Sequence, residues 1–282
     1  MTQRPTRSAL YIPGSKERAL DKARGLATDV ILFDLEDAVA VEEKGNARAT
    51  LAAELAKGGY GARLRIVRIN ALDTPWGTED AAAVAQMDCD AVLLPKVNGP
   101  DDIDALAALI DLPIWAMMET PLGILNAAAI AAHGRVQGFV MGTNDLAKDL
   151  NTRTVANREP LLMSLQMCLL AARAHGVIAL DGVYNAFKDD DGLRAECEQG
   201  RDMGFDGKTL IHPAQLVIAN AAFAPTEAEI DLANRQIAAF DAAEAAGQGV
   251  AVVDGKIVEN LHIVTARATL EKAKAIAEMD AT

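Results

Sequence analysis

Short apolar strands alternate with alanine-rich amphipathic segments eight times along residues 1–224, which predicts an α/β fold of the (β/α)8, or TIM-barrel, type. The strands are mostly continuous in apolar residues rather than alternating, as expected where both faces of a parallel sheet are buried. An open doubly wound sheet is the structural alternative. That fold would normally carry a glycine-rich GxGxxG loop, which this sequence lacks. We therefore expect one barrel domain over residues 1–224.

The predicted strands are four to six residues long, as is usual for the core of a barrel. They lie at Ala9–Pro13, Val30–Asp34, Leu64–Ile69, Ala91–Pro95, Ile114–Met118, Gly138–Met141, Ile178–Asp181 and Lys208–Ile211. The segments between them repeat apolar residues with a helical period. The expected helices lie at Arg18–Leu26, Asn46–Lys57, Ile103–Ile110, Ile124–Ala132, Pro160–His175 and Gly192–Met203.

The pattern changes after residue 224, where a helix–hairpin–helix extension is expected over residues 225–282. Thr226–Ala246 reads as a helix with Thr226 as its N-cap and acidic residues in its first turn. A hairpin turning at Asp254-Gly255 follows, and a last helix is expected at Leu261–Met279. This extension is short for an independent core. We expect it to act as a lid that packs on the barrel or on a neighbouring subunit.

Composition limits the class of protein. The 282 residues include 51% hydrophobic residues and carry a net charge of −13, which disfavours a nucleic-acid partner because such proteins usually present a basic face. No apolar run reaches the roughly 18 residues of a membrane span. The N-terminal residues lead into a strand without the apolar stretch of a secretion signal, so a cytoplasmic protein is expected. The three cysteines form no CxxC pair and indicate neither a disulfide framework nor a zinc site.

Two carboxylates follow successive predicted strands, Glu119 in METPLG and Asp145 in GTNDL. Functional groups in a (β/α)8 barrel gather at the carboxyl ends of the strands. Each segment alone is also typical of a helix start, with Thr120-Pro121 as a cap and first helical residue, or with Asn144 or Asp145 as a cap. As a pair at similar depth, the two carboxylates favour a site for a hard divalent cation, which prefers oxygen ligands.

Arg68 ends the otherwise apolar segment LRIVRIN, and a buried arginine requires anionic partners. It could pair with Glu36 or Asp37 for structural reasons, or bind a substrate carboxylate or carbonyl through two parallel hydrogen bonds. Lys96 allows the same two interpretations, with the structural one favoured.

The turn YIPGSKER combines backbone amides with two cations, Lys16 and Arg18, and could bind phosphate oxygens. An ordinary helix start with two solvated cations is the structural alternative for this segment.

These motifs occur in a recognisable order: YIPGSKERALDKA, DLEDAV, VRIN, LLPKV, METPLGILNA, GTNDLAKDL, DGVY and GFDGKTLIHPAQL. Over residues 8–278 the sequence resembles the citrate lyase β-subunit-like (CitE-like) branch of the HpcH/HpaI aldolase family, which includes malyl-CoA and citramalyl-CoA lyases. The many motifs are specific for the family and much less so for the substrate.

The resemblance implies that Glu119 and Asp145 are Mg2+ ligands, with Mn2+ as a substitute. It implies that Arg68 contacts the substrate oxygen next to the breaking bond. Glu36 and Asp37 match acids near the metal-bound waters and the arginine, and we expect Asp37 to take part in catalysis.

The resemblance also assigns residues to the substrate. Backbone amides around Gly142, Thr143 and Asn144 match the cradle for a keto-acid carboxylate. Lys16 and Arg18 fall in the segment that resembles the coenzyme A loop of the family, where coenzyme A is part of the substrate. A homotrimer, or a homohexamer made of two trimers, is implied by the resemblance.

The extension departs from the family at one position. Coenzyme A lyases carry a GKMID-type sequence after the hairpin, and its aspartate reaches a neighbouring active site as an acid or base. This chain reads GKIVE, so Glu259 stands where aspartate is expected. A misplacement of about 1 Å can cost roughly a hundredfold in rate. Either the backbone compensates or the reaction differs from that of the lyases.

The leading expectation is a Mg2+-dependent carbon–carbon lyase that splits a 3-hydroxyacyl-CoA, such as malyl-CoA or citramalyl-CoA, into acetyl-CoA and a 2-keto acid, glyoxylate or pyruvate. Arg68 would polarise the reacting oxygen, and Glu259 would manage the proton. A malyl-CoA-type thioesterase that uses the same site is the alternative. A citrate lyase β-type subunit and a catalytically silent scaffold are further alternatives.

Overall fold

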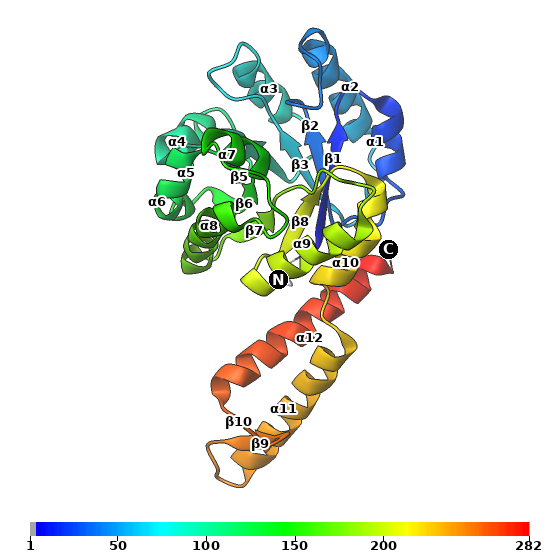
Figure 1. Cartoon of the computed structure of the whole chain (residues 1–282). Helices are drawn as coiled ribbons and strands as arrows, with labels where there is room; N and C mark the ends of the chain where they lie inside the picture. Colours follow the sequence, from blue (N-terminus) through cyan, green and yellow to red (C-terminus); the bar gives the residue numbers. More distant parts are fainter. Residues whose placement is uncertain (1–3, 282) are drawn as a thin grey trace. The chain divides into compact units, whose positions relative to one another are not determined.

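The computed structural model describes residues 4–281. It divides into two compact units, of which the larger comprises Thr6–Phe223 and the smaller comprises the chain from Ala224 onward together with residues 4–5. Figure 1 traces the chain through both units.

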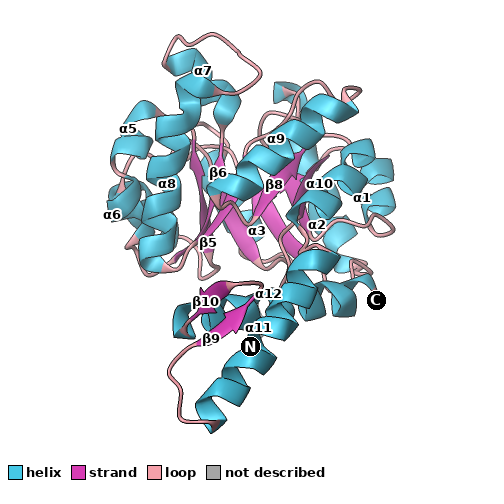
Figure 2. Cartoon of the chain, turned by 60° about the horizontal axis from the view of Figure 1, so that its bottom comes forward, coloured by secondary structure: helices cyan, strands magenta, loops and turns pink. Residues whose placement is uncertain are grey.

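The larger unit is a closed barrel of eight parallel strands, in which each strand pairs with the next and β1 pairs with β8. The strands are β1 (Ser8–Pro13), β2 (Val30–Asp34), β3 (Leu64–Arg68), β4 (Ala91–Leu94), β5 (Ile114–Met118), β6 (Val136–Met141), β7 (Ile178–Asp181) and β8 (Gly207–Leu210). Figure 2 shows these strands surrounded by helices. The predicted (β/α)8 barrel is confirmed, and every predicted strand has a counterpart within two residues at each end.

The helices of the barrel agree with the prediction less completely. They are α1 (Glu17–Ala23), α2 (Lys44–Ala56), α3 (Gly77–Val84), α4 (Pro100–Ala107), α5 (Pro121–Leu125), α6 (Ala127–Ala131), α7 (Thr143–Asp149), α8 (Leu162–His175), α9 (Asp190–Met203) and α10 (Leu216–Phe223), with short 3-10 turns at Val41–Glu43, Glu159–Leu161 and Pro213–Gln215. The single helix expected at Ile124–Ala132 is two, because Asn126 leaves helical geometry and its side-chain amide donates to the Asn98 carbonyl at 2.7 Å.

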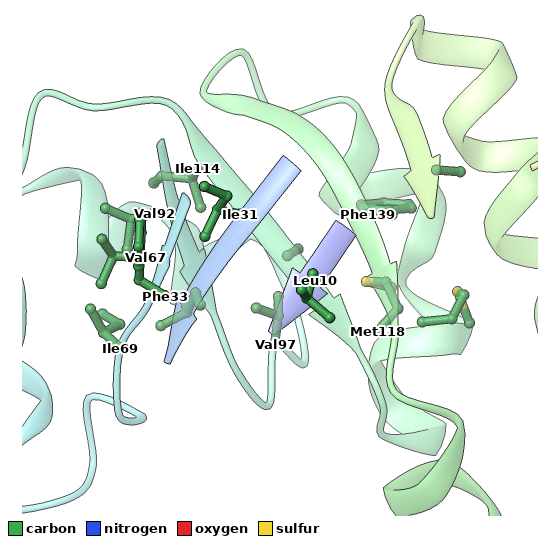
Figure 3. Packing of buried hydrophobic residues seen from close by; sticks show 14 of the residues in the cluster. Leu10, Ile31, Phe33, Val67, Ile69, Val92, Val97, Ile114, Met118 and Phe139 are labelled. Atoms are coloured by element: carbon green, nitrogen blue, oxygen red, sulfur yellow. The ribbon is translucent and has the colours of Figure 1, made fainter. Parts of the chain in front are cut away.

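Strand side chains point alternately into the barrel and out toward the helices, and both sets are buried. Inside lie Ala9, Val30, Leu32, Ile66, Ala91, Leu93, Trp115, Met117, Val140 and Leu180. The outward set packs under the helices, and Figure 3 labels several of its members, such as Ile31, Phe33 and Val67. Burial on both faces explains why the strands read as continuous apolar runs.

The pairing of neighbouring strands places their last residues side by side at the carboxyl ends of the barrel. Asp34, the last residue of β2, is the partner of Arg68 at the end of β3, and Met118 of β5 is the partner of Met141 of β6. Residues that directly follow these strands therefore emerge at a common height. The positions of the polar strand-end residues are set by this pairing.

The smaller unit contains α11 (Glu227–Ala245), the hairpin of β9 (Ala251–Val253) and β10 (Lys256–Val258), and α12 (Asn260–Asp280). Thr226 caps α11, its hydroxyl accepting from the Glu229 N–H at 3.2 Å. Asp254 and Gly255 both have positive φ, as a two-residue type I′ hairpin requires. The predicted helix–hairpin–helix is thus present. Its action as a lid on a neighbouring subunit stays a prediction.

None of the helices within residues 4–281 combines the length and apolar character needed to cross a membrane.

Tight packing inside the barrel should make substitution of Gly138 destabilising. A Cβ atom at this position would lie 2.2 Å from the Trp115 ring, which fills the barrel where β5 and β6 shift register. We expect Gly138→Ala to lower the free energy of unfolding by about 1–3 kcal/mol, the usual cost of overpacking. Urea denaturation measures the change. Gly134→Ala is the matched control, since its Cβ would meet nothing within 4 Å, and equal stability of the two variants would contradict the prediction.

Candidate active site

A cavity of about 280 Å³ opens at the carboxyl ends of the barrel strands. Residues from seven strands and the segments that follow them line it: Tyr11, Asp34, Asp37, Ala38, Arg68, Met117, Met141, Gly142, Thr143, Asn144, Asp145, Val183, Asn185 and Ile211. The wall therefore combines apolar side chains with a few convergent charges, which is usual for the binding site of a small molecule.

Arg68 is fixed from two sides. Its Nε and Nη2 donate to the two carboxylate oxygens of Asp34 at 2.8 and 2.6 Å, and its guanidinium lies 4.8 Å from the centre of the Tyr11 ring. Asp34 in turn accepts from the N–H groups of Glu36 and Ala38, both at 2.9 Å. The arginine is thus held in one orientation by a carboxylate that is itself anchored to the following turn.

Glu36 and Asp37 are both neighbours of Arg68, as the sequence predicted. Nη1 of Arg68 lies 2.8 Å from Glu36 Oε2 and 3.3 Å from Asp37 Oδ2. The principal partner, Asp34, was missed, and so was Tyr11. The spacing of three acids in FDLED after an apolar strand was the available signal, but only the register identifies which acid faces the arginine.

Three carboxyl groups share the single positive charge of Arg68, so one of them can retain a proton. Burial raises the pKa of Glu36 to about 8, since Arg68 only partly offsets the lost hydration and the neighbouring acids raise it further. The Asp37 side chain is 70% exposed and solvated by contrast. Glu36 can therefore exchange a proton near neutral pH.

Glu119 and Asp145 converge on one point, as expected. Glu119 directly follows β5 and is buried, and Asp145 lies in the first turn of α7 and is one-third exposed. The ammonium Nζ of Lys96 lies 2.6 Å from Asp145 Oδ1 and 3.5 Å from Glu119 Oε1. Burial raises the pKa of Glu119, whereas Lys96 counteracts that shift. One cation is thus already in contact with both carboxylates.

The capping alternative also holds for part of this segment. The Thr120 hydroxyl accepts from the Gly123 N–H at 3.0 Å and Pro121 begins α5. Glu119 takes no part in this cap, because its Oε1 instead accepts from the N–H of Lys96 at 2.8 Å. Asp145 makes no cap bond at the start of α7. The cap and a cation site therefore coexist one residue apart.

Gly142, Thr143 and Asn144 line the cavity where β6 passes into α7. A Cβ atom at Gly142 would lie 2.4 Å from Glu119 Cβ, so only glycine allows the two segments to approach so closely. The Asn144 and Asn185 side-chain amides pair reciprocally at 2.8 and 3.3 Å, joining the β6 and β7 loops.

The donor set fits a magnesium ion. Between residues 4 and 281 no group of three histidine, cysteine or acidic side chains could enclose a metal. Mg2+ usually keeps several waters and takes one or two carboxylates together with substrate oxygens, and it does not need a complete protein cage. Two carboxylates beside an open cavity meet that requirement.

Four of the predicted residues are not part of this cavity wall. Glu119 is buried directly next to Gly142, which does line it, and the other three lie elsewhere. Lys16 precedes α1 and Arg18 lies in its first turn, and both side chains are exposed. Glu259 belongs to the smaller unit, where it is exposed before α12 and its N–H donates to His262 Nδ1 at 3.0 Å. Their roles in coenzyme A binding and proton transfer stay predictions.

Comparison with known proteins places these features in a family. The model of the HpcH/HpaI aldolase/citrate lyase family matches residues 7–213. A (3S)-malyl-CoA thioesterase of Cereibacter sphaeroides (strain ATCC 17029) is 67% identical over 99% of this chain and 98% of its own. The citrate lyase subunit beta of Leuconostoc mesenteroides subsp. cremoris is 34% identical over 97% and 95%.

Solved structures give the same relationship. The crystal structure of CitE from Mycobacterium tuberculosis in complex with magnesium, acetoacetate and coenzyme A superposes with a TM-score of 0.82 at 29% identity, covering 97% of this chain and all of that one. RipC from Yersinia pestis gives a TM-score of 0.69 at 30% identity, over 80% of this chain and 98% of that one.

The thioesterase relatives overturn the leading expectation of a carbon–carbon lyase. Four relatives that are 67% identical over almost the whole chain carry the name of a hydrolase, which was the alternative. Relatives named as thioesterases and as citrate lyase subunits both match this chain over almost its whole length, so the strand-end motifs indicate the family without specifying which bond breaks. The matched model and these full-length relatives show that the protein is an enzyme and that it belongs to the HpcH/HpaI aldolase/citrate lyase family.

Proposed function

We propose that this protein is a Mg2+-dependent thioesterase that hydrolyses a (3S)-malyl-CoA-type thioester to the free hydroxy acid and coenzyme A. The observation that carries the proposal is the 67% identity, over nearly the full length of both chains, with proteins named (3S)-malyl-CoA thioesterase. Two carboxylates that both contact the Lys96 ammonium, and an arginine that is held by Asp34, support it.

Glu119 and Asp145 would hold the Mg2+ ion, with Mn2+ as a substitute, through one carboxylate each. Their shared contact with one ammonium supports this assignment, as does the magnesium in the related CitE complex. The ion would supply Lewis-acid polarisation of a substrate oxygen.

Arg68 and the amides of Gly142, Thr143 and Asn144 would bind the anionic end of the substrate. The guanidinium is rigid because Asp34 and Tyr11 hold it, so it can orient a substrate oxygen with little loss of entropy. Lys16 and Arg18 would attract the phosphates of coenzyme A through exposed positive charge, as the resemblance implies.

Hydrolysis needs a base for water, and Glu36 is the candidate in the barrel. In its ionised form this carboxylate would accept a proton as the water oxygen bonds to the thioester carbon. The C–S bond then breaks, and the sulfur leaves as a thiolate that takes up a proton to give the free thiol. The raised pKa of Glu36 suits it to accept a proton near neutral pH.

The first prediction concerns the products. Incubation of the protein with (3S)-malyl-CoA and Mg2+ should release free coenzyme A and malate in equal amounts, without acetyl-CoA. A thiol assay together with chromatography of the acyl-CoA species measures both. Formation of acetyl-CoA and glyoxylate in place of the free thiol would contradict the proposal.

The second prediction concerns Arg68. Arg68→Lys keeps the charge but cannot reproduce the planar fork that bonds Asp34 and a substrate oxygen together. Loss of one charge-assisted hydrogen bond, worth about 1.5–3 kcal/mol, should lower kcat/KM by roughly tenfold to a hundredfold. Steady-state kinetics measures the effect, with circular dichroism to verify folding. A folded variant with the kcat/KM of the wild type would contradict the proposed role of Arg68 in binding the substrate.

The third prediction concerns pH and Glu36. Its folded pKa of about 8 lies above its ordinary value of 4.5, so the folded state binds this proton more tightly and wild-type stability should fall as the pH rises between these values. Glu36→Gln is neutral at every pH and should lack this fall. Activity of the wild type should rise through about pH 8, and the variant should lose that limb.

Denaturation midpoints and pH–rate profiles check the third prediction. Glu259→Gln is the companion variant, because the extension was expected to supply the base. If Glu259→Gln abolishes the rise in activity with pH while Glu36→Gln retains it, Glu36 is not the base. A trimer or hexamer would let the extension reach the site of a neighbouring subunit. That oligomeric state stays a prediction, and light scattering measures it.

A further inference from the structure

The side chain of Lys96 lies in contact with both proposed metal ligands. Its ammonium is 2.6 Å from Asp145 Oδ1 and 3.5 Å from Glu119 Oε1, so it makes an ion pair with each carboxylate. Two carboxylates that converge on one point repel each other unless a cation lies between them. In this structure the side chain of the protein itself supplies that cation.

The backbone of Lys96 is fixed while its side chain has room to move. The residue has a backbone φ of +53°, which residues other than glycine rarely adopt. Its N–H donates to Glu119 Oε1 at 2.8 Å, and its carbonyl accepts from Asn98 Nδ2 at 3.1 Å. The side chain is 41% exposed, so the ammonium can leave the carboxylates without any change in the main chain.

We propose that Lys96 is a built-in counter-cation whose ammonium neutralises Glu119 and Asp145 before metal binds and then exchanges places with the divalent ion. This inference rests on the proposed function, since it assigns those two carboxylates to the metal. The ammonium brings the local charge of the pair from −2 to −1. Metal binding must therefore displace a charge-assisted hydrogen bond, which weakens the observed metal affinity.

The exchange has two consequences of opposite sign. Removal of the ammonium leaves the two carboxylates facing each other unneutralised, which destabilises the metal-free protein. The same removal relieves the competition and strengthens metal binding. A lysine that served only to support the loop would behave differently, because its loss would loosen the ligands and weaken metal binding as well.

The test is titration of metal-free protein with Mn2+ alone, and separately with Mg2+ alone, by calorimetry. Lys96→Met keeps the length of the side chain without its charge. It should bind Mn2+ about tenfold more tightly than the wild type, and its metal-free form should unfold at a lower temperature. Unchanged or weaker Mn2+ binding by the folded variant would overturn the exchange.

A second variant avoids dependence on one substitution. Lys96→Gly removes the amine and suits the positive φ, so it should also bind Mn2+ more tightly. Lys148→Met is the charge control. Lys148 is exposed in the last turn of α7, three residues beyond Asp145, and its loss should change the affinity far less than the loss of Lys96. An equal effect would attribute the gain to net charge and overturn the proposal.

Failure of the inference is distinguishable from failure of the proposed metal site. If the wild type binds Mn2+ and Glu119→Gln does not, the metal site stands, and the Lys96 variants alone decide the exchange. If neither the wild type nor Lys96→Met binds Mn2+ while both are folded, the metal site and the inference built on it are both refuted.

Discussion

The paired hydrogen bonds between Arg68 and Asp34 are the interaction on which the site depends. A guanidinium that is only 6% exposed must have an anionic partner, and the register of β2 and β3 supplies one at the same height. Asp34 also binds the N–H groups of Glu36 and Ala38, so the ion pair fixes the turn that carries two further acids. Loss of Arg68 would leave the buried Asp34 carboxylate without its cation, which is much more costly than the loss of an exposed pair.

That ion pair also shapes the protonation of its surroundings. Asp34 accepts from two N–H groups of the guanidinium, and Glu36 faces the same cation. Burial raises the pKa of Glu36, Arg68 offsets this shift in part, and the neighbouring acids add to it. The Lys96 ammonium pairs with Glu119 and Asp145. The site therefore combines one acid that can hold a proton near neutral pH with a pair of carboxylates that one cation neutralises in part.

The strand-end motifs of this sequence indicate its family but do not specify its reaction. The chain matches relatives named as thioesterases and relatives named as citrate lyase subunits, so membership of the family is compatible with more than one reaction. The sequence motifs therefore led to the family and to the wrong leading reaction. The resemblance implied an aspartate where this chain has Glu259, but a single residue in an extension does not say which bond is broken.

The sequence by itself determined the barrel, the extension and the convergence of Glu119, Asp145 and Arg68. Apolar period, caps and turn residues are local signals, and the end of a parallel strand has a known place in such a barrel. Only the tertiary structure decided that Asp34 rather than Glu36 is the main partner of Arg68, that Tyr11 stacks beneath it, and that the Lys96 ammonium lies between the two carboxylates. These contacts depend on strand register and side-chain direction across residues far apart in the chain, which no local pattern specifies.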